Sequence, residues 1–101
     1  MLKPGYYRGR SENEIANDLS REGLTPTRVV EQPGSRYDSH KNAYDILMGF
    51  VSGTADIRIG DKSYKCYAGD RLIISGGVEH SATVGLNGCV YYMTQCPTCA
   101  D

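Results

Sequence analysis

The sequence contains two histidines, His40 and His80, and each stands where an imidazole could bind a metal ion or another ligand. Imidazole nitrogen binds Zn, Cu, Fe and Ni, and it also exchanges protons near neutral pH. Asn42 follows His40 by two positions, so both side chains point to one side if this segment is extended. His80 begins the run HSATV, where it shares a face with Ala82 and Val84. We therefore expect an imidazole at the rim of an apolar interior.

These residues are compatible with two kinds of site. In one, His40, Asn42 and His80 bind a divalent transition metal such as Fe, Ni, Mn or Zn. In the other, no metal is bound, and the imidazoles are neutral, hydrogen-bonded groups that line a cavity. A mostly apolar cavity with a few convergent polar groups is typical of small-molecule sites. The histidines of either site can also act as acid and base.

Tyrosine is the dominant aromatic residue, with eight copies against one phenylalanine and no tryptophan. Tyrosine suits half-buried strands and interfaces, which explains most of this excess. Tyr44 lies close to His40 in the sequence, and Tyr91 and Tyr92 are adjacent in an apolar run, where one of the two faces inward. We consider Tyr44 and Tyr92 as pocket residues on this basis.

The composition is that of one globular domain. A chain of 101 residues with 40% hydrophobic and 23% charged residues can bury roughly two thirds of the surface that its unfolded form exposes. Eleven Lys and Arg balance twelve Asp and Glu without a basic run, so nucleic acid and anionic membranes are not expected partners. No apolar stretch resembles a membrane span or a secretory signal, and we expect a soluble cytoplasmic protein.

Residues 11–23 are predicted to form the one helix. Ser11 and Glu14 have the spacing of a capping box, in which hydroxyl and carboxylate each satisfy a free backbone donor. Ile15 and Leu19 share a face that can pack on a core. We expect a short surface helix with no chemical role.

The remainder of the chain is predicted to be β-structure. Short apolar runs alternate with Gly, Pro and Asp after residue 23, which is typical of an all-β sandwich or barrel. Gly60-Asp61 and residues 85–88 are expected to form hairpin turns. The predicted strands are 27–31, 46–51, 55–59, 63–67, 71–74, 80–84 and 89–94.

The predicted strand 46–51 is apolar on both faces. Ile46 and Phe50 lie on one face, and Leu47 and Val51 lie on the other. Such a strand is covered on both sides. We expect the core on one side and a second sheet or a second subunit on the other.

Two spaced patterns extend over residues 34–84, half of the chain. The first consists of Gly34, His40, Asn42, Ile46 and Gly53. The second consists of Gly69, Ser75, Gly77, His80 and Val84. Their order and spacing resemble the two motifs of the cupins, GxxxxxHxH followed by Glu and Gly, and GxxxxxPxGxxHxxxN. The resemblance implies an all-β double-stranded β-helix, or jelly-roll barrel, with one short N-terminal helix.

This resemblance implies a single domain over residues 1–101. Its parts would be an arm and helix at 1–23, the barrel at 27–94 and a tail at 95–101. Small cupins are often homodimers, so we also expect a homodimer, which agrees with the doubly apolar strand 46–51.

The resemblance also implies a metal site from which two ligands have been lost. The usual cupin ligands are two histidines and a glutamate from the first motif and one histidine from the second. Here Asn42 replaces a histidine and Ile46 replaces the glutamate, so that His40 and His80 remain. Asp45 is the nearest carboxylate, but its position alternates with that of His40 and it is expected to point away from the barrel.

The four cysteines are expected to be reduced, because a chain with a real core does not need disulfides. Cys96 and Cys99 form a CxxC near the end of the sequence. This spacing is compatible with a frayed tail or with a redox pair. A structural metal site would require Cys66 and Cys89 to come close as well.

Two functions follow from these patterns. The first is a non-catalytic small-molecule binding or sensing module that binds a divalent metal weakly or not at all. The second is a metal-dependent cupin enzyme, an oxygenase or isomerase acting on a small organic substrate. The fold cannot select the substrate, because cupin barrels serve many unrelated chemistries. The expected pocket residues are His40, Asn42, Tyr44, Ile46, His80 and Tyr92.

Overall fold

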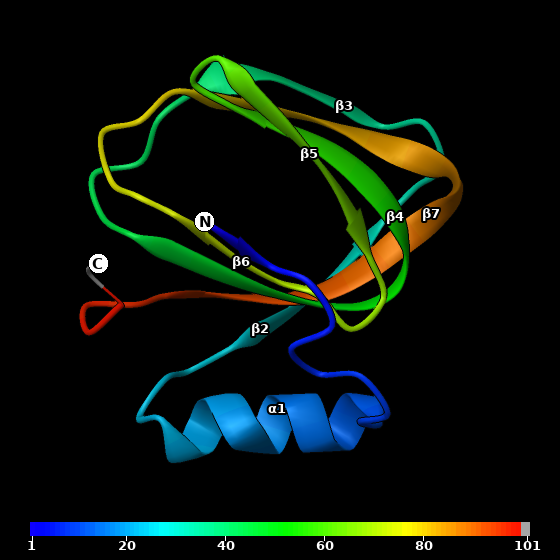
Figure 1. The fold of residues 1–101 in the computed structure, drawn as a ribbon, viewed down its shortest axis with the longest axis vertical. Helices are drawn as coiled ribbons and strands as arrows, with labels where there is room; N and C mark the ends of the chain where they lie inside the picture. The colour runs from blue at the N-terminus through cyan, green and yellow to red at the C-terminus, as the bar shows by residue number, and fades with distance from the viewer. Residues whose placement is uncertain (100–101) are drawn as a thin grey trace.

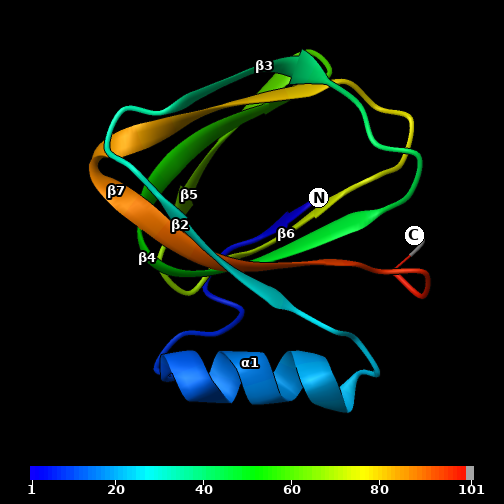
Figure 2. The same ribbon diagram turned by 180° about the vertical axis from the view of Figure 1, so that it is seen from behind.

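The chain forms one strongly curled antiparallel sheet, with a helix lying across the outside (Figures 1 and 2). The computed structural model describes residues 1–99. Helix α1 spans Glu12–Arg21. The strands are β1 (Leu2–Lys3), β2 (Thr27–Glu31), β3 (Arg36–His40), β4 (Ile46–Ile59), β5 (Lys62–Tyr67), β6 (Arg71–Ile74) and β7 (His80–Gln95). Mostly β-structure with one helix is the predicted fold class, which is thereby confirmed.

The long strands β4 and β7 organise the sheet. β4 pairs with β5, β6 and β7, while β7 pairs with β2, β3 and β4. The short β1 pairs with β6 at the edge. The Gly60-Asp61 hairpin turn is confirmed, since Ile59 and Lys62 are cross-strand partners.

The predicted turn at residues 85–88 is wrong, because this segment lies inside β7. Similarly, the predicted strands 46–51 and 55–59 are two halves of β4. The glycines that suggested turns instead permit a bend with close contact between the two long strands. A Cβ on Gly53, where φ is 76°, would lie 2.0 Å from the carbonyl oxygen of Gly88. Glycine within a strand thus marks an irregular pairing here, and the register of β4 against β7 shifts at this point.

Helix α1 forms as its sequence predicts. The hydroxyl of Ser11 accepts from the backbone N–H of Glu14, and the Glu14 carboxylate accepts from the N–H of Ser11. Ile15 and Leu19 are buried. The helix has 10 residues, and no helix among residues 1–99 is long and apolar enough to cross a membrane.

Helix α1 also explains why strand 46–51 is apolar on both faces. Ile46 and Phe50 belong to the cluster inside the barrel. Leu47 belongs to a second cluster, which includes Ile15 and Leu19 of α1 and lies between the sheet and the helix. The expectation that a second sheet or subunit covers this face is therefore corrected: the chain's own helix covers it.

Arg71 attaches the helix and the N-terminal arm to the sheet. Its side chain is almost fully buried and donates two hydrogen bonds to the Glu22 carboxylate, at 2.9 and 3.0 Å. It also donates to the hydroxyl of Tyr7 at 3.1 Å, and its guanidinium lies 4.7 Å from the Tyr6 ring centroid. One polar side chain thus connects β6 with two segments that precede the barrel.

The end of the chain contains a disulfide between Cys96 and Cys99, which corrects the expectation of four reduced cysteines. The tail is held in place because the backbone N–H of Cys96 donates to Asp45 and its side chain packs in the cluster beneath the helix. Cys66 and Cys89 are free thiols and are buried. The last two residues of the predicted tail, 100–101, lie outside the described residues.

Candidate functional site

The two histidines meet on neighbouring strands. His40 ends β3 and His80 begins β7, and they are direct cross-strand partners. Their ring centroids are 4.2 Å apart, with 60° between the ring planes. A shared site for His40 and His80 requires that the two imidazoles lie close together, as they do here. β3 itself was not among the predicted strands, because all five of its residues are exposed and show no apolar alternation.

Each imidazole is oriented by a backbone carbonyl. Nδ1 of His40 lies 3.0 Å from the carbonyl oxygen of Asp38, and Nδ1 of His80 lies 3.3 Å from that of Val78. A carbonyl only accepts, so Nδ1 carries the proton in each neutral ring and Nε2 keeps its lone pair. Within residues 1–99, neither Nε2 has a hydrogen-bond partner. The pair therefore offers two free acceptors.

The environment of His80 favours its neutral form. Burial lowers the pKa of the His80 imidazole below its ordinary value, and the neighbouring imidazole of His40 lowers it further. The hydrogen bond with Val78 opposes this shift without reversing it. His80 is thus an uncharged acceptor at neutral pH.

The depressed pKa of His80 predicts a loss of stability in mild acid. The imidazole of residue 80 binds a proton more readily in the unfolded chain than in the folded one. The stability that neutral His80 contributes is therefore present above about pH 6.5 and is lost as the pH falls below that value. We expect the free energy of unfolding to fall less steeply between neutral and mildly acidic pH in His80→Gln than in the natural chain. Urea unfolding across this range measures the slope. Equal slopes in the two proteins would contradict a depressed pKa.

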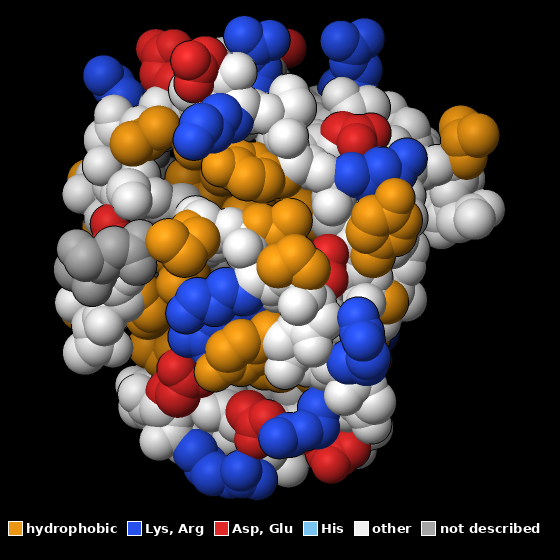
Figure 3. Space-filling model, in the orientation of Figure 1, with side chains coloured by type: hydrophobic (Ala, Val, Ile, Leu, Met, Phe, Trp, Pro, Cys, Tyr) orange, Lys and Arg blue, Asp and Glu red, His pale blue; other side chains and the backbone are white. Residues whose placement is uncertain are grey.

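A cavity of about 780 Å³ opens beside the histidines. Its walls come from β2, β3, β4, β6 and β7 together with residues 23–25, Asn42, Tyr44 and Pro97. Most of its lining is apolar and includes Val29, Met48 and Ile57. Figure 3 shows a different face of the molecule, on which hydrophobic side chains lie among Lys and Arg side chains and no histidine is visible. The volume is in the range of small-molecule sites, roughly 300 to 1,000 Å³.

Five of the six expected pocket residues line this cavity. They are His40, Asn42, Tyr44, Ile46 and His80.

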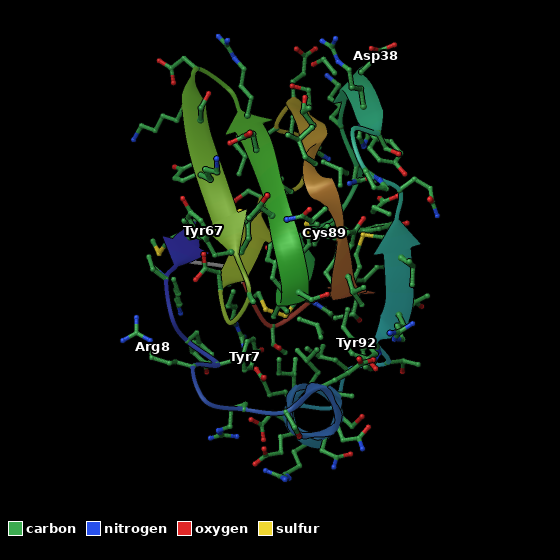
Figure 4. The ribbon with its side chains drawn as sticks, turned by 90° about the vertical axis from the view of Figure 1, so that its right-hand side faces the viewer. Tyr7, Arg8, Asp38, Tyr67, Cys89 and Tyr92 are labelled. Carbon is green, nitrogen blue, oxygen red and sulfur yellow. A yellow bond between two sulfur atoms is a disulfide. The ribbon has the colours of Figure 1, made fainter. Side chains whose placement is uncertain are left out.

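Tyr92 does not line the cavity, and this placement is corrected. Its hydroxyl donates to Glu12 of α1 at 2.7 Å, and its ring packs with the cluster beneath the helix. Figure 4 shows Tyr92 on the helix side of the sheet, as Tyr7 is. Adjacent residues of a strand point to opposite faces, and Tyr91 takes the inward position.

Sequence reasoning missed a polar cluster formed by Glu31, Tyr37 and Tyr91. The hydroxyl of Tyr37 donates to one oxygen of the Glu31 carboxylate at 2.6 Å, and that of Tyr91 donates to the other at 2.8 Å. All three residues line the cavity. The hydrogen bond with Glu31 raises the pKa of Tyr37, while burial and then Glu31 raise that of Tyr91. The one feature of the sequence that indicates this cluster is the spacing of Val29 and Glu31, which places the Glu31 side chain on the same face of β2 as an apolar residue.

The donor set does not complete a transition-metal site. Within residues 1–99, no group of three or more His, Cys, Asp and Glu side chains is close enough to bind one ion. Ile46 occupies the carboxylate position of the motif and is only 7% exposed. The carboxylate of Asp45 accepts from the backbone N–H of Gly76 at 2.7 Å, and Asp45 does not line the cavity. Catalytic zinc sites use three good protein ligands, and the non-heme iron triad needs a carboxylate. This site offers two imidazoles and the amide of Asn42, which is a poorer ligand.

This curled sheet with its open interior is the cupin fold. No family model and no curated protein sequence matches the chain, but several solved structures do. One is a cupin-2 domain-containing protein from Shewanella frigidimarina, with 22% identity over 71% of this chain and 69% of that one, at a TM-score of 0.62. An RmlC-like cupin from the same organism has 19% identity over 77% and 69%, at 0.65. KdgF from Halomonas sp. has 16% identity over 71% and 67%, at 0.62. Likeness at these identities shows the fold alone, and it confirms the resemblance in that respect.

Proposed function

We propose that this chain binds a small organic molecule in the cavity between β2, β3, β4 and β7. The proposal rests on one observation: an apolar cavity of about 780 Å³ is lined by two imidazoles whose Nε2 atoms have no hydrogen-bond partner within residues 1–99. A mostly apolar lining stabilises the body of a ligand, and a few convergent polar groups orient it. His40, Asn42 and His80 supply such groups at one part of the wall.

Filling the cavity tests this function directly. Val29 lines the cavity from β2, whereas the next residue, Val30, is outside the lining and 56% exposed. We expect the neutral apolar probe 1-N-phenylnaphthylamine to bind the natural chain saturably, and Val29→Trp to weaken binding roughly tenfold or more by occupying its space. Fluorescence titration measures both affinities.

Val30→Trp is the matched control, because it places the same side chain on the opposite face of the same strand. Its affinity should equal that of the natural chain. Equal binding by Val29→Trp and the natural chain would place the probe elsewhere and contradict the proposal.

A metal-dependent enzyme is the second candidate, and the paired imidazoles favour it. Metal-binding histidines commonly donate their second ring nitrogen to a carbonyl, as His40 and His80 do. The missing third ligand argues against tight binding. We therefore propose at most weak divalent-metal binding by His40, Asn42 and His80.

The metal content of untagged protein distinguishes the two candidates. We expect Fe, Ni, Mn and Zn to be far below one equivalent after purification without added metal, measured by plasma mass spectrometry. One equivalent that disappears in His80→Ala would favour the enzyme. A metal that is retained in His80→Ala would lie outside this site.

A further inference from the structure

We infer that the cavity selects a ligand with a protonated amine attached to an apolar body, an inference that rests on the proposed small-molecule function. The first observation is charge. Among the described residues, Glu31 is the only Asp, Glu, Lys or Arg in the lining of the cavity. An anionic ligand would therefore meet a carboxylate and no compensating cation there, while a cation would gain an attractive partner.

The second observation is the hydrogen bonding of the Glu31 carboxylate. Two phenol hydrogen bonds fix its orientation, one on each oxygen. An ionised carboxylate has about four acceptor positions, so each oxygen keeps capacity for a further donor. The hydrogens of Tyr37 and Tyr91 are already used in these bonds, so their oxygens offer lone pairs to the cavity. This part of the wall accepts hydrogen bonds and carries negative charge.

The third observation is that the imidazoles of His40 and His80, like the Glu31 carboxylate, present hydrogen-bond acceptors to the cavity. The carbonyls of Asp38 and Val78 take the Nδ1 protons, and both Nε2 atoms are left as acceptors. Acceptors thus dominate both polar parts of the cavity wall. A protonated primary amine, with three donors and no acceptor, complements them.

Three probes of similar size and different charge test the inference. They are 2-phenylethylamine, 2-phenylethanol and 3-phenylpropionate, titrated into labelled protein at neutral pH with a chelator present, so that bound metal contributes to no measurement. Amide and imidazole shifts in the nuclear magnetic resonance spectrum report binding at the cavity. We expect the amine to bind roughly tenfold more tightly than the alcohol, through charge-assisted hydrogen bonds, and the carboxylate to bind most weakly.

Removing the charge should remove the preference. In Glu31→Gln, which keeps the size of the side chain, the affinities for amine and alcohol should become nearly equal. Tyr37→Phe keeps the carboxylate and should retain the preference, which separates loss of charge from disturbance of the cluster. Glu79→Gln is the control for total charge, since Glu79 is exposed and outside the cavity lining. It should leave the ratio unchanged.

The outcomes separate the inference from the proposed function. If the alcohol binds at the cavity as tightly as the amine, the inference is overturned while the small-molecule function stands. Retention of the amine preference in Glu31→Gln would overturn the inference in the same way. If none of the probes shifts cavity resonances at millimolar concentration, both are overturned.

Discussion

Replacing Asn42 with His and Ile46 with Glu together should raise the affinity of this chain for Zn²⁺ or Ni²⁺ by roughly a hundredfold or more. The substitutions supply the two ligands that the cupin motif contains and that positions 42 and 46 of this chain do not provide. Both positions line the cavity that already contains His40 and His80. Together with His40 and His80, the two new side chains would give a set of three imidazoles and one carboxylate. These are ligands that zinc and nickel prefer. Competition against a chelating dye measures the affinity.

The design also predicts a stability signature. A glutamate at the buried position 46 is costly without a cation, so the metal-free variant should melt below the natural chain and recover when Zn²⁺ is added. The same pair of substitutions in a His80→Ala background is the control and should lose most of the gain. Unchanged affinity in a folded variant would show that positions 42 and 46 do not converge with the imidazoles on one point.

Replacing Glu22 with Ala should lower the free energy of unfolding by about 3 kcal/mol. Within residues 1–99, Glu22 is the only acidic partner of Arg71, whose side chain is 6% exposed. Burial lowers the pKa of the Arg71 guanidinium, but its hydrogen bonds with Glu22 and Tyr7 outweigh burial and hold it above the ordinary value. Arg71 therefore stays charged, and the variant leaves a buried cation beside the Tyr7 hydroxyl and the Tyr6 ring without a carboxylate. Urea unfolding measures the change.

Two further variants show whether the unpaired charge is responsible. Removing both partners, in Glu22→Met with Arg71→Met, should be less damaging than Glu22→Ala, because no buried charge remains. Arg21→Met removes an exposed ion pair with Asp18 and should change stability by less than about 1 kcal/mol. A Glu22→Ala variant no less stable than Arg21→Met would mean that Arg71 regains water when its partner is lost.

The proposed preference for an amine connects these tests to function. The acceptors of the imidazole pair would serve a metal in the redesigned site and a protonated amine in the natural one. Both would be cations, which suits a cavity where Glu31 is the only Asp, Glu, Lys or Arg that the described part of the chain contributes to the lining. The absence of a histidine at position 42 and of a carboxylate at position 46 is thus compatible with an organic cation in this cavity.

Local features of this protein could be predicted from its sequence. The capping box of Ser11 and Glu14 and the alternation in residues 55–59 involve neighbours along the chain, and both appear as expected. The convergence of His40 and His80 was also accessible, because motif spacing and strand alternation together placed both rings toward one interior. The glycines at 85 and 88 predict a turn that the structure does not have, because glycine permits a tight turn and a close contact within a long strand equally well.

Tertiary structure alone decided what covers each face. Alternation required Tyr91 and Tyr92 to point to opposite sides, but it could not say that Tyr91 faces the cavity and Tyr92 the helix. In the same way, Leu47 showed that a second apolar face exists, and only the path of α1 showed that the chain covers it. The carboxylate of Glu31 joins two tyrosines that lie 6 and 60 residues away in the sequence. Sequence periodicity reports the direction of a side chain relative to its own strand, whereas its partners depend on how distant strands pair and curl.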